Sequence, residues 1–181
     1  QKPSYEDLQL RVSELEAALA RSQKIEKKLR GSERRLAETI DFLPDAMFAI
    51  DLEGKVIAWN RAIEALTGIK SEDILGKGNY EYALPFYGAR RPVMIDLVLN
   101  WDETTAKKYV YIKRQGNVLV SETSNPPFRD APAHFWNSAL PLYNDSGEVV
   151  GAIEVIRDIT DLKQAHEDLK ASEQLLKTYV E

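Results

Sequence analysis

Cysteine is absent from this chain of 181 residues. Without a thiol, the chain forms no disulfide, has no thiolate nucleophile and offers no cysteine ligand to zinc. The flavin–cysteine adduct used by some light-sensing proteins is excluded for the same reason. A chain without cysteine also fits the reducing cytoplasm, where disulfides are rare.

Long apolar runs are missing as well. No stretch approaches the roughly 18–20 apolar residues that are needed to cross a bilayer, and the first residues lack the apolar core of a signal peptide. We therefore expect this piece to be soluble and cytoplasmic. A membrane anchor of a longer parent protein would lie outside it.

The chain has no concentration of positive charge. Its net charge is −5, and its basic residues include scattered pairs at Arg34–Arg35, Arg90–Arg91, Lys107–Lys108 and Lys113–Arg114. Nucleic-acid binding needs a clustered basic face that neutralises phosphates. We therefore expect no nucleic-acid partner.

Residues 5–43 contain no proline and only one glycine, Gly31. Apolar residues alternate there at spacings of three and four, which is the seam of a heptad repeat. The seam consists of Leu8, Val12, Leu15, Leu19, Leu29, Leu36, Ile40 and Leu43, interrupted by the polar residues Ser22, Glu26 and Glu33. We expect residues 1–40 to form a coiled-coil helix that pairs with a second copy of the chain. A solvated single helix, or one that lies on its own domain, remains an alternative.

A second heptad seam ends the chain, in a predicted signalling helix at residues 159–181. Its apolar positions are Leu162, Leu169 and Leu176, and polar His166 and Glu173 lie between them. Residues 29–36 (LRGSERRL) resemble residues 169–176 (LKASEQLL), as expected for a tandem array with adjacent domains in the parent chain. Parallel and antiparallel pairing both stay open.

The middle of the chain, residues 41–158, alternates short strands and short helices. The predicted helices cover residues 60–68, 71–75 and 92–100, with Asn60 and Ser71 as N-caps and Pro92 in a first turn. The predicted strands are Ala46–Asp51, Val56–Trp59, Asn117–Thr123, His134–Tyr143 and Glu148–Arg157. This order favours an α+β fold in which helices cover one face of an antiparallel sheet.

Five short motifs follow one another through the same region, at residues 41–46 (DFLPDA), 51–60 (DLEGKVIAWN), 75–77 (LGK), 145–153 (DSGEVVGAI) and 157–160 (RDIT). Together they make residues 36–162 similar to the PAS family of sensory domains. The resemblance implies a five-stranded antiparallel sheet with helices on one face around a small-molecule pocket. It also implies dimerisation through flanking helices and a parent with an output such as a histidine kinase. The segment Trp101–Arg114 is longer than in the simplest family members.

The resemblance also indicates where the pocket would lie. Its candidate walls are Tyr80, Tyr82, Phe86, Met94, Leu97 and Trp136, and Arg90, Arg91 and Asn137 would anchor an anionic ligand. Aromatic residues at such positions are equally typical of an ordinary core. The two arginines can also face solvent. The sequence leaves the ligand unknown.

The two histidines argue against histidine-dependent chemistry. His166-Glu167 resembles a kinase phosphoacceptor box, but Asp168 and Ala171 stand where that box has an apolar residue and proline. Haem-binding PAS domains usually ligate iron from the helix before the third strand, and residues 82–100 contain no histidine. A lone histidine such as His134 rarely holds a metal.

Catalysis is not expected either. Carboxylates such as Asp51, Glu64 and Glu154 stand alone in the sequence, without a partnered base or nucleophile. We expect this fragment to be no enzyme and to hold neither haem nor metal, while a parent histidine kinase stays compatible with it.

The junction between the last strand and the last helix consists of Asp158, Ile159 and Thr160. Asp158 or Thr160 can accept backbone N–H groups at the helix start, so we predict a signal junction there. Two functions fit the whole pattern. One is a sensory or relay module that detects a small molecule or transmits a conformational change to an output domain. The other is a ligand-free structural spacer and dimerisation module.

Overall fold

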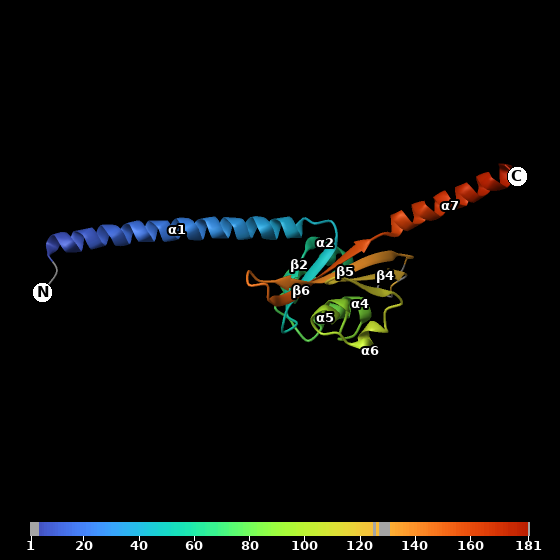
Figure 1. Cartoon of the computed structure of the whole chain (residues 1–181), viewed down its shortest axis with the longest axis horizontal. Helices are drawn as coiled ribbons and strands as arrows, with labels where there is room; N and C mark the ends of the chain where they lie inside the picture. The colour runs from blue at the N-terminus through green and yellow to red at the C-terminus, as the bar shows by residue number, and fades with distance from the viewer. Residues whose placement is uncertain (1–3, 125, 127–130, 181) are drawn as a thin grey trace. The chain divides into compact units, whose positions relative to one another are not determined.

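The structure is a computed structural model that describes residues 4–124, 126 and 131–180. The chain divides into two compact units, Gln1–Asp41 and Phe42–Glu181. The first unit holds the long helix α1, and the second holds the sheet, the short helices and the C-terminal helix α7 (Figure 1).

Helix α1 runs without a break from Tyr5 to Asp41. Ser4 Oγ accepts the backbone N–H of Asp7, whose carboxylate accepts the N–H of Ser4 in return, so the first turn is capped from both sides. None of its side chains is buried. At about 1.5 Å per residue the helix is roughly 55 Å long, and its seam of apolar residues is open to solvent within one chain.

The second unit is built on a sheet of six strands in the order β2-β1-β6-β5-β4-β3, in which every neighbouring pair is antiparallel. The strands are β1 (Ala46–Asp51), β2 (Val56–Trp59), β3 (Ile112–Gln115), β4 (Val118–Ser124), β5 (His134–Tyr143) and β6 (Val149–Asp158). The expected antiparallel α+β fold is confirmed. The strand count is not, because five strands were expected.

The additional strand β3 comes from the long segment Trp101–Arg114. Gly116 turns the chain with a φ of 60°, and Ile112 then pairs with Ser121 on β4. The buried Ser121 hydroxyl donates to the carbonyl of Tyr111 at 2.7 Å and fixes the start of β3. The sequence showed the extra length but not this pairing, since β3 is mostly exposed and has little apolar alternation.

The short helices are α2 (Arg61–Thr67), α3 (Ser71–Ile74), η1 (Glu81–Ala83), α4 (Leu84–Tyr87), α5 (Met94–Leu99) and α6 (Glu103–Ala106). Helix α5 packs against β4, β5 and β6, and we call the sheet face that it covers the inner face. Phe135, Asn137 and Ala139 alternate along β5 as buried residues of this face.

One predicted cap, at Ser71, and one predicted helix start, at Pro92, were wrong. Ser71 is the first residue of α3 and no cap; the Glu64 carboxylate accepts its backbone N–H at 2.7 Å instead. Pro92 precedes α5, which begins at Met94, and the Asp96 carboxylate accepts the N–H of Val93. Glu64 reaches Ser71 from the preceding helix α2, which a local sequence rule does not detect. Asp96 stands at the third position of α5, a local signal that was overlooked.

The predicted cap at Asn60 is confirmed. Asn60 Oδ1 accepts the backbone N–H of Ile63 in α2 and also the N–H of Met47 in β1, while Asn60 Nδ2 donates to the carbonyl of Asp45. This buried amide therefore joins α2 to the beginning of β1. Gly68 ends α2 with a φ of 74°, as expected.

Helix α7 spans Thr160–Val180 and follows β6 after a single intervening residue. No helix among the described residues is long and apolar enough to cross a membrane.

Candidate ligand cavity and signal junction

A small cavity lies between the inner face of the sheet and α4. Its volume is about 60 Å³. Its walls are mostly aromatic and aliphatic, with three polar side chains from three adjacent strands. The lining residues are Phe48, Phe86, Tyr87, Val93, Tyr109, Thr123, Pro126, Phe135, Asn137, Glu154 and Ile156.

Glu154 is the charged residue of the cavity wall. It lies on β6 opposite Phe48 of β1 and Ala139 of β5, and only 7% of its surface is exposed. One oxygen, Oε2, accepts the backbone N–H of Ile95 at 3.0 Å. Burial raises the pKa of Glu154 to about 8; the Ile95 hydrogen bond opposes the shift and Asp96 adds to it.

Asn137 and Thr123 supply the other polar groups from the sheet. Asn137 Nδ2 donates to Thr123 Oγ1 at 3.2 Å, and Asn137 lies opposite Ile156 of β6, two residues along from Glu154. Asn137 and Glu154 face the same side of the sheet. Glu154 lies opposite Ala139, which is two residues from Asn137 on β5, and alternate residues of a strand point to the same face. The cavity therefore has a polar floor on β4, β5 and β6 and apolar walls around it.

The sequence candidates are divided among several places. Phe86 and Asn137 line the cavity. Tyr80, Tyr82 and Leu97 line a separate cleft beside α5, of about 630 Å³. Met94 is fully buried in a core cluster with Leu97, Leu119 and Ala139.

The remaining candidates belong to the surface around α4. Arg91 and Trp136 border a hollow of about 460 Å³, where the Arg91 guanidinium stacks 3.7 Å from the ring centre of Tyr87. Arg90 pairs with Glu81 through Nε at 2.9 Å. The cavity thus takes its polar character from Glu154, which sequence reasoning treated as an isolated carboxylate. A charged residue inside the apolar run 149–156 was the available signal.

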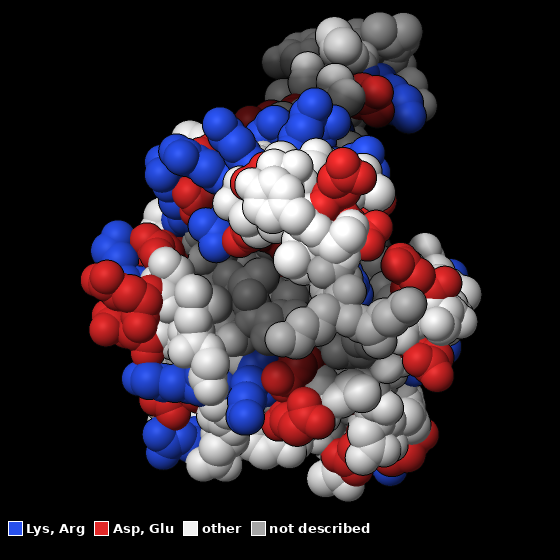
Figure 2. All heavy atoms as spheres, turned by 90° about the vertical axis from the view of Figure 1, so that its left-hand side faces the viewer, with Lys and Arg blue, Asp and Glu red and all other residues white. Residues whose placement is uncertain are grey.

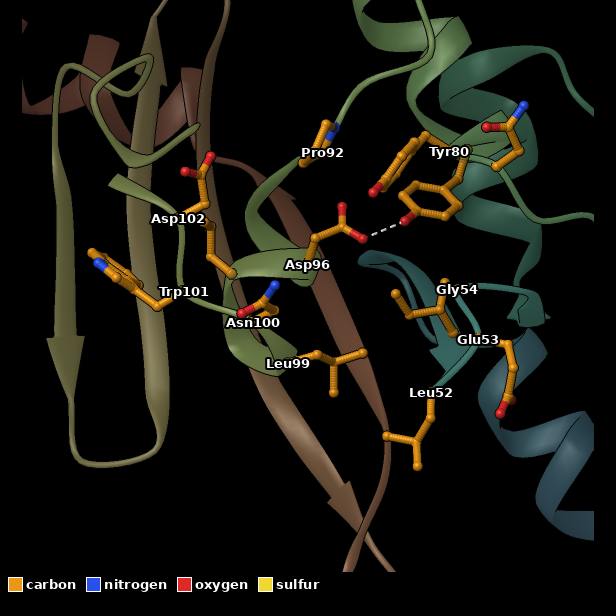
Figure 3. Close-up of a pocket in the computed structure, with 14 residues that line it drawn as sticks. Leu52, Glu53, Gly54, Tyr80, Pro92, Asp96, Leu99, Asn100, Trp101 and Asp102 are labelled. Atoms are coloured by element: carbon orange, nitrogen blue, oxygen red, sulfur yellow. Dashed lines mark hydrogen bonds between the residues drawn. The ribbon is translucent and has the colours of Figure 1, made fainter. Parts of the chain in front are cut away.

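The cleft beside α5 is shown in Figure 3, where Asp96 reaches from α5 toward the tyrosine side chains. The Tyr82 hydroxyl donates to Asp96 Oδ1 at 2.5 Å. Burial raises the pKa of Asp96, and burial together with Asp96 raises the pKa of Tyr82. Asp96 thereby stabilises both the start of α5 and the buried ring of Tyr82.

The predicted signal junction is joined to the beginning of β5. The backbone N–H of Ile159 donates to the carbonyl of His134 at 2.8 Å, and the N–H of His134 donates to Thr160 Oγ1 at 3.0 Å. Asp158 Oδ1 accepts both the N–H and the hydroxyl of Thr160. The expected cap is therefore made by Asp158, while the Thr160 hydroxyl oxygen is used across strands.

A second contact holds the first turn of α7. Lys163 Nζ lies 2.7 Å from Glu122 Oε1 on β4. Further along the chain, the seam residues Leu162, Leu169 and Leu176 are 58–68% exposed. In α1, the seam residues Leu8, Val12, Leu15, Leu19, Leu29, Leu36 and Ile40 are 37–66% exposed.

Possible metal sites and surface charge are two further features for which the sequence sets expectations. Among residues 4–124, 126 and 131–180, no three His, Cys, Asp or Glu side chains form a group that could hold a metal ion. On the face drawn in Figure 2, basic and acidic side chains lie interspersed.

A family model described as the PAS fold matches residues 34–159. Two-component system protein A of Emericella nidulans is 27% identical over 166 residues, which cover 90% of this chain and 22% of that protein. The methanogenesis regulatory histidine kinase FilI of Methanothrix harundinacea is 26% identical over 149 residues, which cover 82% of this chain and 15% of that kinase. The chain thus spans about a fifth or less of these relatives.

Among solved structures, the PAS domain of Bordetella pertussis BvgS has a TM-score of 0.52 and 18% sequence identity. The match covers 81% of this chain and 98% of that chain. At this identity the likeness bears on the fold alone.

Proposed function

The chain belongs to the PAS family, and on that premise we propose that it is a sensory or relay module. A small molecule in the cavity, or a change passed from a neighbouring domain, shifts β5 and β6 and thereby reorients α7. The output domain belongs to the longer parent protein.

The observation that carries this proposal is the position of His134. It is the first residue of β5 and makes two backbone hydrogen bonds to the junction, with Ile159 and Thr160. Phe135 and Asn137, one and three residues further along, line the cavity. A displacement of β5 by a ligand therefore acts on the start of α7 through very few bonds.

The exposed seams support a dimeric output. A row of leucines that stays solvent-exposed over many helical turns is unfavourable in water, and heptad spacing matches a pairing helix. We propose that α1 and α7 each pair with the same helix of a second copy. Multi-angle light scattering tests this; a monomer at high micromolar concentration would contradict it.

The relatives suggest the kind of output. One is named a two-component system protein and another a regulatory histidine kinase, and the chain matches only part of each. We propose that the module acts on a kinase-type output in its parent chain and performs no catalysis itself.

Hydrogen exchange tests the junction. The change Asp158→Ala removes the acceptor of the Thr160 N–H, so amide exchange in residues 160–165 should become at least about tenfold faster. Asp145→Ala, in the exposed turn between β5 and β6, is the matched control and should leave α7 unchanged. If amide exchange in residues 160–165 is equally fast in both variants, the proposed role of the junction is wrong.

The ligand-free spacer remains the rival, and the small volume of the cavity favours it. Native mass spectrometry of the purified chain distinguishes the two. A small molecule retained by the folded protein supports sensing, whereas a bare chain that still dimerises supports the spacer.

A further inference from the structure

The Glu154 carboxyl lies in the wall of the small cavity. Among the described residues, no Lys, Arg or His makes an ion pair with it. The titratable groups around it are Asp96 on α5, Tyr82 on η1 and Tyr109 after α6, with Tyr87 of α4 also in the cavity wall. Arg91 stacks on Tyr87 and opposes the burial that raises the pKa of Tyr109, so it brings a positive charge to this side of the cavity. It is not, however, among the groups that shift the pKa of Glu154.

A buried carboxyl in such a place is favoured in its neutral form, because an unpaired charge is costly away from water. The pKa of about 8 has the same cause. In the neutral form the oxygen that accepts the Ile95 N–H, Oε2, is the carbonyl oxygen. The proton then belongs to Oε1, for which the described residues offer no hydrogen-bond partner, so the cavity wall carries an O–H donor.

We propose that the cavity binds a small, uncharged, planar molecule whose carbonyl or ring-nitrogen acceptor receives a hydrogen bond from the Glu154 hydroxyl. This assignment rests on the proposed sensory function. Cationic ligands are disfavoured because they require the carboxylate. Anionic ligands are disfavoured because none of the described residues that line the cavity is basic.

The shape of the cavity suits a flat ligand, but its size is small. A volume of about 60 Å³ corresponds to about two waters at their share of liquid volume, so a six-membered ring enters only if the lining side chains move outward. Phe48, Phe86 and Phe135 provide flat walls, against which a planar ring stacks well. Asn137 offers its amide beside the carboxyl for a second hydrogen bond.

Three probes of one shape test the charge preference: benzamide, benzoate and benzamidinium. The full 181-residue chain is titrated with each by NMR at pH 7 and pH 9. We expect benzamide to bind at least about tenfold more tightly than either ion at pH 7. Its affinity should fall by about tenfold at pH 9, because Glu154 loses its proton over this range.

The variant E154Q separates the hydroxyl from other effects. Its amide can accept the Ile95 N–H and still donate into the cavity, so benzamide binding should persist and lose its pH dependence. E154L has no donor and should bind benzamide at least about tenfold more weakly than E154Q. The exposed control E72Q should behave as wild type, with its pH dependence intact.

The outcomes separate this assignment from the sensory function. Tighter binding of benzamidinium, increasing with pH, overturns the uncharged ligand and leaves ligand sensing intact. If no probe binds but native mass spectrometry finds a retained molecule, the ligand class is wrong and the sensory function stands. If no probe binds and nothing is retained, the ligand assignment and ligand sensing are both wrong, and only a relay or spacer function is left.

Discussion

Helix α1 has 37 residues and buries none of them, whereas the first part of β5, from His134 to Ala139, alternates between half-buried and buried side chains. The helix is formed by contacts between near neighbours, such as the ion pairs Arg30–Glu26 and Arg34–Glu38. Strand β5 is stabilised by hydrogen bonds to two other strands, β4 before it and β6 after it in the chain. The same substitution should therefore have different consequences in the two regions.

The largest contrast concerns glycine. A Cβ on Gly151 of β6 would lie 2.2 Å from the carbonyl oxygen of Ile50, so the two strands would have to separate. We expect Gly151→Ala to lower the free energy of unfolding by about 3–5 kcal/mol, measured by urea denaturation of the second unit. An unchanged midpoint would mean that β1 and β6 are less tightly paired there than the register indicates.

Buried charge gives the next largest effect. The folded chain binds the Glu154 proton more tightly than the unfolded chain, so wild-type stability falls as pH rises from about 4.5 to about 8. E154Q removes this titration and should be more stable than wild type by roughly 2–4 kcal/mol at pH 9. The difference should vanish near pH 4, and thermal unfolding at both pH values measures it.

The junction should respond more moderately. Thr160→Val removes the acceptor of the His134 N–H, which lies in a half-buried position. We expect a loss of about 1–2 kcal/mol and faster amide exchange at His134, while Thr160→Ser keeps the oxygen and serves as the control. Similar behaviour of both variants would show that the hydroxyl does not hold β5 to α7.

The smallest expected effect is a gain in stability, and it concerns Gly31. At Gly31 of α1 a Cβ would meet only the distant end of Arg35, at 4.0 Å, and alanine is the better helix former. Gly31→Ala should stabilise α1 by about 0.5–1 kcal/mol, seen as greater helicity at low concentration. A loss of helicity would indicate that a partner helix needs the small residue.

The parts of the fold that depend on local patterns were predictable. The strands Ala46–Asp51, Val56–Trp59 and His134–Tyr143 have the expected bounds, because alternation and turn residues determine them. The cap of α3 and the start of α5 were misjudged. Glu64 reaches Ser71 only because the chain folds back after α2, whereas Asp96, three residues after Val93, was a local signal that was overlooked.

The candidate site was predicted only in part. Phe86 and Asn137 line the cavity, but Tyr80, Tyr82 and Leu97 line the separate cleft of Figure 3. Helical and loop residues close in sequence face different spaces once the helix is placed. The position of a residue in the sequence does not tell which space its side chain faces, because that depends on how the helix is rotated about its axis in the folded chain.

The sequence by itself determined the order of the elements, the two heptad seams, the PAS motifs and the exclusion of thiol chemistry. These follow from periodicity, turn residues and composition, which act between near neighbours. The tertiary structure decided the inward position of Glu154 and the bonds from His134 to the junction. These depend on segments that are distant in sequence, and only folding brings them within hydrogen-bonding distance.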